Sequence, residues 1–129
     1  MKLKRMDHIG INCGNFSESL KFYRDILGLK QQSTIKYPQF NITYIGLPDN
    51  SRIELFDYGI RRERNVQDDS LVGYRHIAFE ADDVEAWEQH LRDNGIKISL
   101  SATVMADLGV QVLLFEDPDG TIIEICKAL

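Results

Sequence analysis

An internal repeat constrains the fold of this chain more than any other feature. The segment MDHIGINCGNFSESLKFYRDILGLK (6–30) resembles YRHIAFEADDVEAWEQHLRDNGIK (74–97). Each begins with an alternating run that carries an early histidine, continues in a helical pattern and reaches a glycine near its end. The segments 46–56 and 116–126 also correspond, at a constant offset of 70 residues. The repeat predicts two structural modules of the same kind in tandem.

Local signals give each module its elements. Asn15 followed by Glu18 indicates a helix N-terminus, and Gly28 ends that helix. The second helix is expected to start near Asp82-Asp83 and to stop at Asn94-Gly95, with Val84, Trp87 and Leu91 on its apolar face and Trp87 in the core. Three strand-like runs follow each helix, at about 30–36, 41–47 and 51–57, then at about 97–104, 109–116 and 121–127. The turn sequences Pro48-Asp49-Asn50 and Pro118-Asp119-Gly120 precede the last strand of each module.

The predicted fold class is therefore α+β, with two βαβββ modules in one domain. Module one covers about 5–57, a polar linker about 58–73, and module two about 74–129. A net charge of −5 argues against nucleic acid or an anionic membrane as partner, and no apolar run is long enough to span a membrane. Two cysteines make no disulfide framework, so a cytoplasmic location is expected.

Four strands carry one His or Glu on the face opposite their apolar side chains. A buried carboxylate is costly unless something binds it. A single strand His is more often a core or surface residue, and a single strand Glu often faces water, but here the same placement recurs in both modules. Imidazole nitrogens and carboxylate oxygens suit one divalent ion of Ni, Zn, Co, Fe or Mn. The predicted ligands are His8, Glu54, His76 and Glu124.

The runs FYRDILGL (22–29), IELF (53–56), HIAFEADDVE (76–85) and FEDPDGTIIEI (115–125) resemble the vicinal oxygen chelate superfamily. That superfamily includes glyoxalase I, bleomycin-resistance proteins and extradiol dioxygenases. The resemblance covers 6–126 and implies an open, curved, barrel-like sheet of eight strands around the metal, with helices outside.

The resemblance implies a metal-dependent lyase or isomerase of glyoxalase I type. Such an enzyme transfers a proton within a small carbonyl or thiol-hemiacetal substrate. Glu124 is the first candidate for the base, and Glu54 is the symmetry-related alternative. A methylmalonyl-CoA epimerase-like enzyme is a serious rival, because its ligand set is similar. Extradiol dioxygenases use two His and one Glu, and bleomycin-binding members lack the ligand set, so a dioxygenase and a non-catalytic binding protein are weaker alternatives.

Asn12, Phe56 and Tyr58 are candidates for substrate binding. Bacterial members resembling glyoxalase I carry an Arg four residues after the first ligand and an Asn four residues after the second, and both contact glutathione. Asn12 and Tyr58 occupy these positions here, which argues against glutathione as co-substrate. The apolar strands of a half-barrel favour a homodimer over a monomer.

Overall fold

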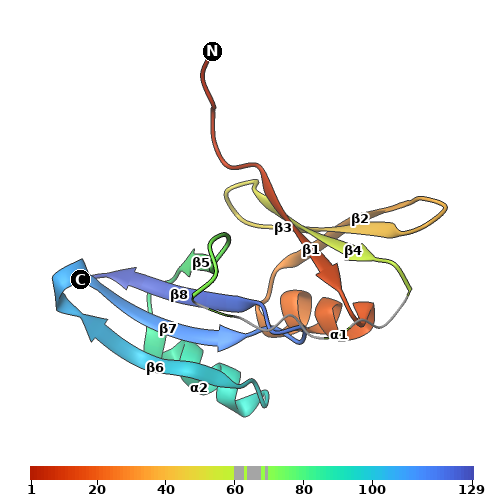
Figure 1. Cartoon of the computed structure of the whole chain (residues 1–129). Helices are drawn as coiled ribbons and strands as arrows, with labels where there is room; N and C mark the ends of the chain where they lie inside the picture. Colours follow the sequence, from red (N-terminus) through yellow and green to blue (C-terminus); the bar gives the residue numbers. More distant parts are fainter. Residues whose placement is uncertain (60–62, 64–67, 69) are drawn as a thin grey trace. The chain divides into compact units, whose positions relative to one another are not determined.

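The computed structural model describes residues 1–129 apart from 60–62, 64–67 and 69. The chain divides into two compact units, Met1–Glu63 and Arg64–Leu129. The predicted α+β class is confirmed, because each unit forms an open four-stranded mixed sheet with helical structure on it (Figure 1). The linker predicted at 58–73 lies partly outside the described residues. None of the helices in the described part of the chain is both long and apolar enough to cross a membrane.

In the first unit the strand order is β1-β4-β3-β2. The first strand runs parallel to the last, and the other pairs are antiparallel. This arrangement brings residues from the two ends of the module onto neighbouring strands. The elements are β1 (His8–Cys13), α1 (Phe16–Leu20), η1 (Lys21–Ile26), β2 (Lys30–Lys36), β3 (Asn41–Gly46) and β4 (Arg52–Asp57).

The second unit repeats this topology, with the order β5-β8-β7-β6 and a parallel pair formed by its first and last strands. A short 3-10 turn, η2 (Ala106–Leu108), precedes β7. The other elements are β5 (Ile77–Glu80), α2 (Val84–Asp93), β6 (Ile98–Met105), β7 (Val110–Glu116) and β8 (Ile122–Ala128). Asn50 and Gly120, the last residues of the two predicted turns, both have a positive φ, of 66° and 87°.

The helix ends were predicted correctly, but the first helix is irregular. The Asn15 side chain accepts a hydrogen bond from the Glu18 N–H at 3.3 Å, and Asp83 accepts one from the Ala86 N–H at 2.9 Å. After α1 the chain widens into the π-helical turn η1, where the Leu27 N–H donates to the Phe22 carbonyl.

The core of each unit lies between its helix and one face of its sheet. Val84 and Leu91 on α2 are fully buried, whereas Trp87 is only half-buried, so the expectation of a core Trp87 was wrong. Trp87 instead lines an open hollow, and its ring meets the edge of His90 at 5.5 Å between centroids. In the first unit the fully buried strand residues include Ile45, Ile53 and Leu55. The opposite sheet face is left for the candidate site.

Candidate metal and substrate site

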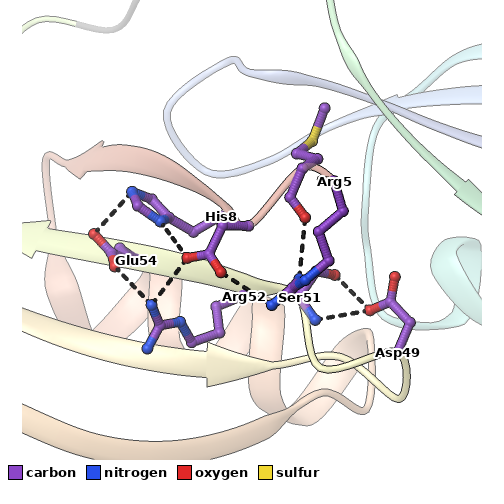
Figure 2. A network of polar contacts seen from close by, with 8 residues as sticks. Arg5, His8, Asp49, Ser51, Arg52 and Glu54 are labelled. Atoms are coloured by element: carbon purple, nitrogen blue, oxygen red, sulfur yellow. Dashed lines mark hydrogen bonds and ion pairs between the residues drawn. The ribbon is translucent and has the colours of Figure 1, made fainter. Parts of the chain in front are cut away.

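The first predicted ligand pair, His8 and Glu54, lies on the parallel strands β1 and β4. Gly10 stands opposite Glu54 in the register, and His8 precedes Gly10 by two residues on the same face. The His8 Nε2 atom lies 3.6 Å from Glu54 Oε2. Figure 2 shows the imidazole and the carboxylate pointing towards each other. We call His8 and Glu54 the first pair.

The second pair, His76 and Glu124, has the same geometry in the other unit. Ala78 stands opposite Glu124 in the parallel register of β5 and β8, and His76 lies two residues before Ala78. The His76 Nε2 atom lies 3.1 Å from Glu124 Oε2. In each module, therefore, a His from the start of the first strand meets a Glu from the last strand.

The first pair belongs to a network of charged groups that sequence reasoning missed. The Arg52 guanidinium lies 3.7 Å from Glu54 Oε1 and 3.2 Å from Asp7 Oδ2, and that same Asp7 oxygen lies 3.0 Å from His8 Nδ1. The hydrogen bond from His8, together with the positive charges of Arg5 and Arg52, lowers the pKa of Asp7 below its ordinary value. Arg52 shares the strand face of Glu54, which is the sequence signal that could have identified it.

The second pair has different neighbours. Cys126 follows Glu124 by two residues on the same face of β8. Burial raises the pKa of the Cys126 thiol, and the nearby carboxylates of Glu124 and Glu80 raise it further. Ile122 occupies the position that corresponds to Arg52. The two carboxylates are therefore chemically unequal: Glu54 has an arginine neighbour and Glu124 has a neutral thiol.

Two of the three predicted substrate residues meet in an aromatic cluster beside the first pair. The Phe40 ring stacks on Phe56, with 5.8 Å between centroids, and lies 5.1 Å from the Tyr58 ring. Tyr37 also stacks on Phe40, with 4.9 Å between the ring centroids. The third predicted residue, Asn12, is exposed and stands opposite Phe56 in the register. Tyr37 and Phe40 were not predicted, although their pattern around Pro38 indicates a turn that carries two aromatic rings.

The donor atoms fit a divalent ion. Each pair presents one imidazole nitrogen and one carboxylate oxygen, the donor types that Zn, Ni, Co, Fe(II) and Mn accept. Within the described residues, no cluster of three or more His, Cys, Asp or Glu side chains is arranged to hold a metal. The structure brings the four predicted ligands together as two pairs, one in each unit.

The sequence profile of the Glyoxalase/Bleomycin resistance protein/Dioxygenase superfamily matches residues 5–125. The chain belongs to this superfamily. Two relatives are similar over nearly their whole length. The uncharacterized protein YaeR of Escherichia coli K12 is 34% identical over 128 residues, covering 95% of each chain. A lactoylglutathione lyase of Haemophilus influenzae is 28% identical over 126 residues, covering 93% of this chain and 90% of the relative.

Solved structures agree with the superfamily assignment. The crystal structure of SMU.1112c superposes with a TM-score of 0.84 and 26% sequence identity, covering 98% of this chain and all of the other. The paired βαβββ modules inferred from the repeat are therefore the architecture of a glyoxalase/bleomycin resistance/dioxygenase superfamily member.

Proposed function

We propose that this protein is a divalent-metal-dependent lyase or isomerase of glyoxalase type. It moves a proton between adjacent carbons of a small carbonyl or thiol-hemiacetal substrate. The observation that carries this proposal is the repeated His–Glu pair: His8 Nε2 faces Glu54 Oε2, and His76 Nε2 faces Glu124 Oε2. Relatives that carry the name lactoylglutathione lyase support it.

His8, Glu54, His76 and Glu124 are proposed as ligands of a divalent metal ion, of Ni, Zn, Co, Fe or Mn. A bound divalent ion would polarise the substrate carbonyl and stabilise negative charge developing on its oxygen atoms. His8 and His76 would contribute neutral imidazole nitrogens, and Glu54 and Glu124 would contribute carboxylate oxygens. The rest of the reaction depends on how the chain holds the substrate and moves a proton.

Glu124 is proposed as the base that removes the proton and returns it to the adjacent carbon. The surroundings of the two carboxylates favour this choice. The Arg52 guanidinium lies 3.7 Å from Glu54 Oε1, so this carboxylate is held by a charged neighbour on its own strand. At the corresponding position beside Glu124 stands the uncharged Ile122, so no guanidinium from that position holds Glu124 in place, and Glu124 is the better candidate for a base that moves.

The aromatic cluster is proposed to hold the part of the substrate next to the reacting carbons. Phe56 follows Glu54 by two residues on the same face, so its ring lies next to a proposed ligand. The cluster offers ring surfaces, and Tyr58 stands where glutathione-using members carry Asn. We therefore propose a substrate with an apolar or aromatic group beside its carbonyl, and a thiol other than glutathione where a thiol is required.

Metal content and proton transfer test the proposal. Protein purified without chelators is analysed for divalent metals, stripped, and reloaded with Ni²⁺, Zn²⁺, Co²⁺, Fe²⁺ or Mn²⁺. In D₂O the loaded protein should convert the hemithioacetal of phenylglyoxal and a small thiol into the α-hydroxy thioester, with deuterium on the carbon that was the ketone carbon of the substrate. The stripped protein should not. A protein that binds no divalent metal, or one that is equally active when stripped, would refute the proposal. Oxygen uptake with catechols would instead favour a dioxygenase.

A further inference from the structure

We infer that Asp7 and Arg52 are positioning residues that fix His8 and Glu54 in one ligand arrangement, while the corresponding residues of the second module, Arg75 and Ile122, cannot act on His76 and Glu124 in the same way. The inference rests on the proposed metal-dependent function and deepens it, because it assigns different roles to the two halves of the site. Four charged or polar side chains in the first unit carry it, and Figure 2 shows three of them, His8, Arg52 and Glu54, directed towards one another.

Asp7 determines which nitrogen of His8 carries the proton. An aspartate side chain is ordinarily ionised near neutral pH, and an ionised carboxylate only accepts hydrogen bonds. At 3.0 Å from Asp7 Oδ2, His8 Nδ1 must therefore be the donor. In the neutral imidazole the other nitrogen, Nε2, then carries a lone pair, and Nε2 is the atom that faces Glu54.

Arg52 orients Glu54, the carboxylate of the first pair. It stands opposite His8 in the register of β1 and β4, and its guanidinium lies within 4 Å of both Asp7 and Glu54. The guanidinium also lies over the Tyr44 ring, 4.7 Å from its centroid, which restricts its position. Because Arg52 is next to Glu54 Oε1, the second oxygen, Oε2, remains directed towards His8.

Two acceptor atoms, His8 Nε2 and Glu54 Oε2, thus face each other across 3.6 Å. Two lone pairs directed at one point repel each other unless a cation or a proton lies between them. The contacts of Asp7 and Arg52 with these two residues orient both atoms, so less ordering is left for the step that binds a metal ion. This is the arrangement expected of prealigned metal ligands.

The second module cannot build the same support from the same positions. Arg75 and Ile122 correspond to Asp7 and Arg52. A guanidinium has no acceptor and an isoleucine side chain has neither donor nor acceptor, so neither can receive a proton from a histidine nitrogen. Positions 75 and 122 therefore give His76 and Glu124 no contact of the kind that Asp7 and Arg52 provide, and the polar neighbour of Glu124 on its own strand is the Cys126 thiol. A less constrained Glu124 suits the proposed role of a moving base, and a fixed Glu54 suits that of a permanent ligand.

The tautomer of His8 is the first readout, and it needs neither metal nor activity. Long-range ¹H–¹⁵N correlation spectra of the metal-free full chain are recorded well above the ordinary histidine pKa of about 6.5. In the unmodified protein His8 should be protonated at Nδ1. Asp7→Ala should remove this preference without changing His76, and Asp7→Asn should restore part of it, because the amide oxygen still accepts. A His8 protonated at Nε2 in the unmodified protein would overturn the inference.

Metal affinity is the second readout, measured by competition between the protein and a chelator for Zn²⁺ or Ni²⁺. Asp7→Ala should weaken binding by about 10- to 100-fold, the usual effect of losing a residue that orients a histidine ligand. Asp25→Ala is the matched control, because Asp25 forms a similarly exposed ion pair with Arg24 in the same unit. If the two variants lose the same affinity, the positioning role of Asp7 is wrong.

A double-variant comparison tests Arg52. The loss of metal affinity caused by Asp7→Ala should differ in a protein that already carries Arg52→Gln. In a protein that carries Arg24→Gln it should be the same as in the unmodified protein. Additive losses in both backgrounds would remove Arg52 from the inference. If neither the unmodified protein nor any variant binds metal, the proposed function is wrong. The His8 tautomer then still decides whether Asp7 positions the imidazole ring.

Discussion

The Phe56 ring lies against Gly10, where an added Cβ would stand 3.2 Å from ring atom Cε2. In the second module, Ala78 corresponds to Gly10 and Cys126 corresponds to Phe56. The alanine methyl group therefore occurs in the module where the residue in place of Phe56 is small. Gly10→Ala should therefore displace the Phe56 ring. Steric crowding of about 1–3 kcal/mol is partly offset by the backbone effect of replacing glycine. We expect a net destabilisation of about 1 kcal/mol in urea unfolding, and a several-fold rise in KM for an aryl substrate. Ala78→Gly is the control, and an unchanged KM in Gly10→Ala would separate Phe56 from the substrate.

Glu124→Gln should mainly lower kcat, whereas Glu54→Gln should mainly lower metal affinity. Loss of a general base lowers kcat by about 10²- to 10⁴-fold, and Glu124→Gln should show this loss even when the protein is saturated with metal. Glu54→Gln should mainly weaken metal affinity, because Glu54 is proposed as the fixed ligand. Chelator competition and kcat under metal saturation separate the two effects. If Glu54→Gln alone abolished turnover at full loading, the assignment of the base would have to be reversed.

Phe40→Leu should reduce discrimination between aryl and methyl substrates. The Phe40 ring contacts the rings of Tyr37, Phe56 and Tyr58, so its loss should open the whole cluster. We expect KM to rise about two- to tenfold for the phenylglyoxal hemithioacetal, because a pair of aromatic rings contributes about 0.5–1.5 kcal/mol beyond area burial. The methylglyoxal hemithioacetal should change less. Equal changes for both substrates would argue against ring recognition.

Glu88 should make the second unit sensitive to acid. Its carboxylate accepts hydrogen bonds from the Ala102 N–H at 2.7 Å and from Arg92, which together lower its pKa. Because the folded-state pKa lies below the unfolded value of about 4.3, the stabilisation is fully present above that value. It disappears as the pH falls through the lower folded-state pKa. The difference in unfolding free energy between the unmodified protein and Glu88→Gln should therefore shrink in acid, with Glu85→Gln as the charge-matched control.

The two helix caps should each contribute about 1 kcal/mol to stability. Asn15→Ala and Asp83→Ala remove the side chains that accept from the Glu18 and Ala86 N–H groups. Denaturant unfolding measures the loss, and Asn15→Ser and Asp83→Ser should recover most of it. A loss that serine does not recover would point to another role for these side chains.

The elements were predictable because their signals are local. Asn15, Asp83 and the turns that end at Asn50 and Gly120 fixed the helix starts and the last strand of each module. Alternation combined with the repeat singled out His8, Glu54, His76 and Glu124, but not their pairing within each module, which comes from the parallel register of β1 with β4 and of β5 with β8. The π-helical turn at Lys21–Ile26 was not predictable, because the same apolar spacing also fits an α-helix.

The network around Asp7 and Arg52 could not be predicted for a different reason. The partners are 45 residues apart, and they meet only because β1 runs parallel to β4 with His8 opposite Arg52. Alternation assigns side chains to faces but does not specify the register between distant strands. With that register known, Arg52 would have been a candidate from its position alone.

The parallel pairing of the first and last strand has a consequence for how such a chain can change over generations. Each module keeps its own histidine and carboxylate side by side, so one copy can exchange the residues around its pair without disturbing the other. Arg52 and Asp7 in one copy, and Ile122 and Arg75 in the other, are such an exchange. Because each pair is complete within its own module, the neighbours of one pair can differ from those of the other while both keep the same histidine and carboxylate.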